Sequence, residues 1–159
     1  MSSSITSATA SARHARSVNF ASIKRKLGRW NWRPRPHDPR HRLGRRGERA
    51  AARFLKRRGQ RIVARNYRCE AGEIDLICLD APHVVFVEVK CRAGDEAQEP
   101  QDAVRTTQWR RIEGAARYFL RRHAAGDRPC RFDLVTVHWP SNGFRRIQHF
   151  EDAHSPRRP

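Results

Sequence analysis

Apolar side chains recur along the chain with two different periods, and each period predicts one kind of secondary structure. From Leu43 onward they follow a spacing of about 3.6 residues until Gly59, which predicts an amphipathic helix over about residues 44–58. The same period returns after a polar loop and predicts a second helix near residues 102–122. A long stretch with a different pattern separates the two helices.

That stretch carries short runs rich in Val, Ile, Leu and Phe, which are typical of strands. Three strands are expected there, and two more, the last one weaker, after the second helix: 61–68, 73–79, 83–91, 131–139 and 144–150. Turn residues join the first three strands by short connections, so these strands should be antiparallel neighbours. The order αβββαβ, with a further strand at the end, predicts an α/β fold with a single mixed sheet flanked by helices.

Composition divides the chain into one domain and two tails. Residues 1–42 are dominated by Ser, Ala and Arg, and up to Arg46 the chain carries twelve basic residues against one acid. We expect a disordered basic extension over residues 1–42, one α/β domain over 43–152 and a disordered tail over 153–159. The extension also resembles an organelle transit peptide in composition, which is the alternative to a basic segment that seeks phosphates.

The charge of the whole chain points to a polyanionic partner. Its 159 residues include 34 Lys and Arg against 16 Asp and Glu, a net charge of +18, so we expect DNA or RNA as the partner. No apolar run is long enough to span a bilayer, and no membrane partner is expected. The cysteines show no paired spacing and indicate a reduced, cytoplasmic setting with free buried thiols: Cys69, Cys78, Cys91 and Cys130.

The second and third strands carry ionisable residues at positions that should meet. If this hairpin folds about the turn at residues 81–82, Asp75 lies across from Glu88 and Glu73 lies across from Lys90. Because side chains alternate along a strand, Glu73 and Asp75 share one face of their strand, and Glu88 and Lys90 share one face of theirs. The apolar neighbours should fill the opposite face: Ile74, Leu76, Val85, Val87 and Val89. Four ionisable groups would therefore converge, around one of only four lysines in the chain.

Two interpretations of this cluster remain open from the pattern alone. Opposed carboxylates destabilise each other unless a cation or a proton lies between them. A Mg²⁺ ion (or Mn²⁺) would remove the conflict, because it accepts one or two carboxylates and completes its shell with water and phosphate oxygens. In the alternative, the face is exposed to solvent, Glu73 pairs with Lys90, and Asp75 is hydrated.

The helices offer further candidates. Glu48 shares a helix face with small apolar residues that could turn toward the sheet, or else it stabilises the helix N-terminus. Gln108 interrupts the apolar stripe of the second helix and could point inward to a phosphate or a water, or else lie at the edge of the stripe. Exposed arginines of that helix, with Trp109 as a stacking residue, could form a phosphate track or be merely solvated: Arg110, Arg111 and Arg117.

The sequence resembles a known family on specific motifs. Gly72-Glu73-Ile74-Asp75, then twelve residues, then Glu88-Val89-Lys90 is similar to the active-site motif of the PD-(D/E)XK nuclease superfamily. The wider frame, from about Leu43 to Phe150, is similar to the YraN family of largely uncharacterised bacterial proteins. Motifs outside the hairpin that carry this second resemblance are Gly47-Glu48, Arg65-Asn66, Ala103-Val104, Ala115-Ala116 and Arg131-Phe132-Asp133.

The resemblance implies a restriction-endonuclease-like fold and a set of roles. Asp75 and Glu88 would bind the metal, the Val89 carbonyl could be a third ligand, and Lys90 would position or activate the attacking water. In this superfamily an acidic residue of the first helix often joins the site, which assigns Glu48 as a ligand or a supporting group. YraN relatives usually carry a lysine where this chain has Gln108, so a cationic contribution at that position is missing here.

Together these features predict a nucleic-acid-binding protein that acts as a Mg²⁺-dependent nuclease on DNA or structured RNA. The main alternative is an accessory protein that keeps the fold and binds nucleic acid without cleaving it, and a third is a basic scaffold that contacts RNA through its N-terminal extension. A homodimer would suit cleavage of both strands of a duplex, because two sites related by a two-fold axis match it.

Overall fold

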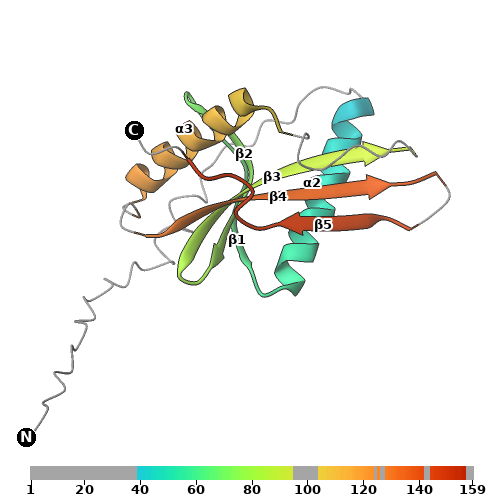
Figure 1. The fold of residues 1–159 in the computed structure, drawn as a ribbon, viewed down its shortest axis with the longest axis horizontal. Coiled ribbons are helices and arrows are strands. Elements are labelled where there is room, and N and C mark those ends of the chain that lie inside the picture. The colour runs from blue at the N-terminus through green and yellow to red at the C-terminus, as the bar shows by residue number, and fades with distance from the viewer. Residues whose placement is uncertain (1–38, 95–103, 124, 126–127, 142–143, 157–159) are drawn as a thin grey trace, which may run out of the picture.

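The computed structural model describes residues 39–94, 104–123, 125, 128–141 and 144–156, which build a five-stranded sheet between two helices (Figure 1). In chain order the elements are α2 (Pro39–Arg57), β1 (Arg61–Cys69), β2 (Gly72–Asp80), β3 (His83–Ala93), α3 (Thr106–Arg122), β4 (Cys130–Trp139) and β5 (Arg146–Phe150). The spatial order is β1-β2-β3-β4-β5; β3 and β4 are parallel, and every other pair is antiparallel. The predicted fold class and element order are confirmed.

Both helices begin at positions other than the predicted ones. α2 starts at Pro39, so residues 39–42, which we assigned to the basic extension, are helical. Proline suits the first turn of a helix, since the N–H that it lacks would have no partner there. α3 starts at Thr106, after the extended backbone of Arg105. The predicted disorder of residues 1–38 and 157–159 concerns segments outside the described residues.

Each face of the sheet packs against one helix. α2 contacts mainly β3 and α3 mainly β2 (Figure 1). Under α2, small side chains allow close approach to a row of valines: Ala50, Ala51, Ala52 and Leu55 pack on Val85, Val87, Val135 and Val137. Under α3 the core is aromatic and larger: Trp109, Ile112 and Phe119 pack with Tyr67, Phe86 and Phe132. Burial of these two apolar layers is the main force that holds the helices to the sheet.

The sheet opens locally at Asp75, where strict alternation fails. Ile74 packs in the core under α3 and Leu76 in the core under α2, so the prediction that both fill one face is wrong. The expected β2–β3 register holds from the turn to Leu76 opposite Val87, where the regular pairing ends. On β1, Asn66 faces this irregular point with a left-handed backbone, φ +49°. The predicted direct pairing of Asp75 with Glu88 therefore gives way to a wider opening between strands.

Two expectations about exposure also change. His154, in the segment predicted as a disordered tail, stacks on Trp109 with ring centroids 4.8 Å apart and contacts Glu113. Trp109 is consequently buried and cannot stack on a base, contrary to its predicted role. All four cysteines are free as expected, but only Cys78 is buried; Cys69 and Cys91 are partly exposed, and Cys130, the first residue of β4, is exposed. No helix in the described part of the chain is long and apolar enough to cross a membrane.

Candidate functional site

Asp75 lies at the point where β2 separates from β3. Its Oδ2 accepts a hydrogen bond from the backbone N–H of Val89 at 2.8 Å, so the side chain occupies the place of a strand partner. Its Oδ1 carries no hydrogen bond from the described residues. Burial, and then the negative charge of Glu88, raises the pKa of Asp75 well above its usual value, although the Val89 N–H opposes the shift. An anionic Asp75 therefore needs a cation that the described residues do not supply.

Glu88 projects from β3 on the α3 side of the sheet and is buried, with 7% of its side chain exposed. Two donors meet at its Oε1: Lys90 Nζ at 2.9 Å and the side-chain amide of Gln108 from α3. Burial raises the pKa of Glu88, and the positive charge of Lys90 reduces that shift. Its second oxygen, Oε2, has no hydrogen bond within the described part of the chain and is available to another ligand.

Lys90 is held by two acceptors. Its Nζ donates to Gln108 Oε1 at 2.8 Å as well as to Glu88. An ammonium group has three protons, so one remains for a water or a phosphate oxygen. Gln108 thus links both groups: its carbonyl orients Lys90 and its amide orients Glu88. An amide can do this because it has both a donor and an acceptor, whereas a lysine at this position would only donate.

Glu48 reaches the site from α2. Its Oε2 accepts a hydrogen bond from the side-chain amide of Asn66 on β1 at 2.8 Å. The negative charge of Glu48 is one of the smaller contributions that raise the pKa of Asp75. The sequence analysis gave Asn66 no role. It could have been noticed because Asn tolerates a positive φ and this Asn lies opposite Asp75. Asn66 orients Glu48 toward the opening of the sheet.

The donor set fits a hard divalent cation held by few protein ligands. Among the described residues, no group of three or more His, Cys, Asp or Glu side chains is arranged to hold a metal ion by itself. Mg²⁺ commonly binds through one or two carboxylates plus water and phosphate. Asp75 and Glu88, each with a free oxygen and a raised pKa, supply such a pair, and Glu48 lies within electrostatic reach of Asp75.

The other predicted residues lie around this centre or away from it. Glu73 is half exposed and forms an ion pair with Arg68 at 3.0 Å, because Arg68 is its direct partner in the β1–β2 pairing. The three arginines predicted as a phosphate track are exposed on α3: Arg110, Arg111 and Arg117. Arg117 forms an ion pair with Glu113 at 3.4 Å. Direct contacts therefore join Glu88, Lys90 and Gln108, and the hydrogen bond to the Val89 N–H places Asp75 next to them in the sheet. Glu48 bonds to Asn66 instead.

A mixed five-stranded sheet between two helices is consistent with a restriction-endonuclease-like protein. Residues 47–137 match the family described as "Uncharacterised protein family UPF0102". The chain is 39% identical over 117 residues to a UPF0102 protein of Pelotomaculum thermopropionicum, covering 73% of this chain and 98% of the relative. It is 44% identical over 112 residues to one of Symbiobacterium thermophilum, covering 70% and 95%.

A third relative, from Nitratidesulfovibrio vulgaris, is 47% identical over 100 residues, which cover 63% of this chain and 75% of the relative. The chain belongs to the UPF0102 (YraN) family, within the restriction-endonuclease-like superfamily. These relatives carry only the family name, so the activity has to be argued from the site itself.

Proposed function

We propose that the protein is a divalent-metal-dependent nuclease that hydrolyses phosphodiester bonds of DNA or structured RNA. The observation that carries the proposal is the geometry of two carboxylates: Glu88 accepts from Lys90 Nζ and from Gln108, and Asp75 accepts from the N–H of Val89, the residue between Glu88 and Lys90. Each carboxylate keeps one oxygen without a hydrogen bond from the described residues. Burying two such groups costs free energy that a purely structural role does not offset, whereas binding a cation does.

Asp75 and Glu88 would hold Mg²⁺ or Mn²⁺, with Glu48 as a supporting negative charge. A divalent cation would neutralise charge that develops on the phosphate and would lower the pKa of a bound water. In hydrolysis the water oxygen forms a bond to phosphorus while the bond to the leaving oxygen breaks. One proton leaves the water and one proton ends on the leaving oxygen.

Lys90 supports this chemistry as an ammonium group. Its two hydrogen bonds to Glu88 and Gln108 use two protons and leave the third for another acceptor. That position favours contact with a phosphate oxygen or with the attacking water, where a positive charge stabilises the transition state. Gln108 acts through Lys90 and Glu88 and is a positioning residue.

The proposal is tested by single-turnover incubation with single-stranded, duplex and branched DNA and with structured RNA, in Mg²⁺ or Mn²⁺. We expect at least one substrate to be cleaved, and Asp75→Ala and Lys90→Ala to reduce the rate constant at least 100-fold, the low end of what one charge-stabilising group contributes. Glu70→Gln, an exposed acid in the β1–β2 turn, is the matched control and should keep the wild-type rate.

Absence of cleavage on every substrate, or equal cleavage by both variants, would contradict the assignment. Tight binding without cleavage, unchanged by EDTA and by Glu88→Ala, would instead support the accessory protein that binds nucleic acid without turnover.

A further inference from the structure

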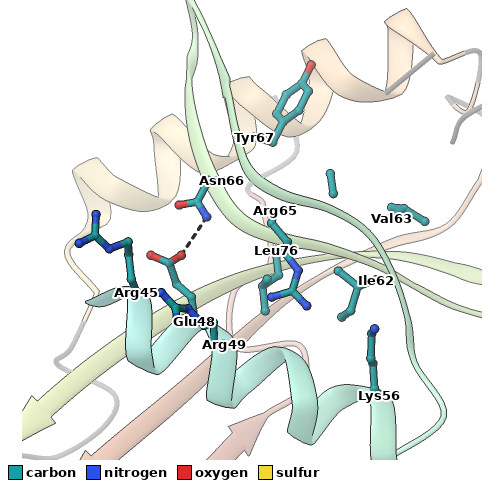
Figure 2. A pocket seen from close by; sticks show the side chains of 11 residues that line it. Arg45, Glu48, Arg49, Lys56, Ile62, Val63, Arg65, Asn66, Tyr67 and Leu76 are labelled. Atoms are coloured by element: carbon teal, nitrogen blue, oxygen red, sulfur yellow. Dashed lines mark hydrogen bonds between the residues drawn. The ribbon is translucent and has the colours of Figure 1, made fainter. Parts of the chain in front are cut away.

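A groove lies between α2 and the edge strand β1, and Glu48 is one of the residues that line it. Its cavity has a volume of about 530 Å³. Figure 2 shows Arg45, Glu48 and Arg49 projecting from α2, and Arg65 and Asn66 from β1, with the Glu48–Asn66 hydrogen bond between the two walls. The groove therefore shares Glu48 and Asn66 with the candidate site, and its wall at Leu76 is next to Asp75 in the chain.

The walls of the groove are cationic. Four basic side chains line it, Arg45, Arg49, Lys56 and Arg65, against one carboxylate, Glu48, which already accepts the Asn66 amide. None of these four cations forms an ion pair with any residue that the structure describes. Several other cations, such as Arg68 and Arg131, are paired with acids instead. The groove thus concentrates positive charge that is free to meet an anion.

The spacing of these cations suits a chain of phosphates. Arg45, Arg49 and Lys56 stand four and seven residues apart on α2, which places them on one face of the helix. With a rise of 1.5 Å per residue, the row is about 16 Å long. Consecutive phosphates of a strand are several ångströms apart, so the row is long enough to meet more than one phosphate of the same strand.

The volume of the groove and its β1 wall favour a single strand of nucleic acid over a duplex. The cavity has the volume of a small-ligand pocket, which admits a segment of one strand but not a duplex. β1 is an edge of the sheet, so its outward backbone groups can hydrogen-bond to sugars or bases. Ile62 and Val63, partly exposed at the irregular point of β1, add apolar surface for contact with bases.

We infer that this groove binds an unpaired strand of nucleic acid and leads its backbone to Asp75 and Glu88. The inference rests on the proposed function, because it names the form of substrate that reaches the same site. The groove residues take no part in bond breaking; their role is affinity and the direction in which the strand runs.

The test measures binding of the full-length protein to a fluorescent 15-nucleotide oligo-dT, in EDTA, by anisotropy over a range of salt concentrations. Arg49→Gln/Arg65→Gln removes two exposed cations from the groove. Each phosphate contact contributes about 0.7 to the slope of log K against log salt, so we expect the slope to fall by about 1.4 and binding at 0.1 M salt to weaken about 25-fold.

The matched control is Arg121→Gln/Arg146→Gln, which removes two exposed arginines from α3 and β5, outside the groove. Its affinity should stay within twofold of wild type, and any contribution of the N-terminal extension is common to all variants. Unchanged binding by the groove variant, or an equal loss in the control, would overturn the inference. An equal loss for a 15-base-pair duplex would overturn the commitment to a single strand.

The result is independent of catalysis. A groove variant that binds normally while wild type cleaves would refute the groove and leave the nuclease standing. Lost binding in the groove variant, with no cleavage by wild type on any substrate, would support the groove and refute the nuclease.

Discussion

Replacing Asp75 by Asn should stabilise the protein at neutral pH in the absence of metal. Asn preserves the shape and can still accept from the Val89 N–H, so the substitution removes mainly the charge. The charge-assisted part of that hydrogen bond is lost, which costs about 1 kcal/mol. In return, the desolvation of a partly buried carboxylate and its repulsion by Glu88 disappear, which together outweigh this loss. We expect a net gain of about 1–3 kcal/mol in the free energy of unfolding.

The sign of the pH dependence follows from the raised pKa. The folded state holds the Asp75 proton more tightly than the unfolded state, whose pKa is about 3.9. The free energy of unfolding of wild type should therefore equal that of the Asn variant below about pH 4. It should become smaller than that of the variant as the pH rises through the folded pKa. Urea denaturation in EDTA at pH 4 and pH 8 measures this gap, with Glu70→Gln as an exposed control that stays within about 0.5 kcal/mol.

Asp133 offers the opposite case in the same domain. It is fully buried, and although burial alone would raise its pKa, hydrogen bonds from His149 and Arg131 lower the pKa below its usual value. Asp133→Asn should thus lose stability above about pH 4, where the unfolded carboxyl ionises. An Asp75→Asn variant that behaves like Asp133→Asn, less stable at pH 8, would refute the interpretation of Asp75 as an uncompensated charge.

Three further outcomes are expected. MgCl₂ at ten times its dissociation constant should raise the free energy of unfolding of wild type by about 1.4 kcal/mol, and KCl of equal ionic strength should not; an equal Mg²⁺ effect on Asp75→Asn would contradict the site. Gly47→Ala should lower the free energy of unfolding by about 1–3 kcal/mol, since the added Cβ would lie 1.6 Å from Cys91 Sγ. Adding Cys91→Ala should restore part of this stability in urea denaturation, and no restoration would refute the steric cause. A thiol reagent should modify exposed Cys130 first and leave Cys78 unmodified in the folded protein, because burial raises the pKa of Cys78 to about 12; mass spectrometry identifies the site, and early labelling of Cys78 would refute the packing.

The strands and their order could be predicted because the signals are local. Runs of β-branched residues separated by turn residues define β1 to β3, and the turn at residues 81–82 determines the register as far as Leu76 and Val87. Alternation could not predict the opening of the sheet. It assumes that every residue continues the pleat, whereas Asn66 adopts a left-handed backbone and Asp75 bonds to the next strand's N–H.

The site residues could be named from the sequence, but their contacts could not. Gln108 stood out because it interrupts an apolar stripe, yet only the packing of α3 on β2 shows that it bridges Glu88 and Lys90. Trp109 was misjudged because His154, far along the chain, covers it. The cationic groove was not predicted, since it forms only when α2 lies beside β1.

If Asp75 and Glu88 hold a divalent cation for phosphodiester hydrolysis, cleavage must depend on the ion and on the Asp75 carboxylate. Both dependences are measured by the single-turnover rate constant on the best substrate, followed against Mg²⁺ concentration for wild type and Asp75→Asn. We expect a rate that saturates with Mg²⁺ for wild type and is about 10³-fold lower or absent for the variant, whose fold is intact. Cleavage that persists in EDTA, or a variant that cleaves as fast as wild type, would contradict it.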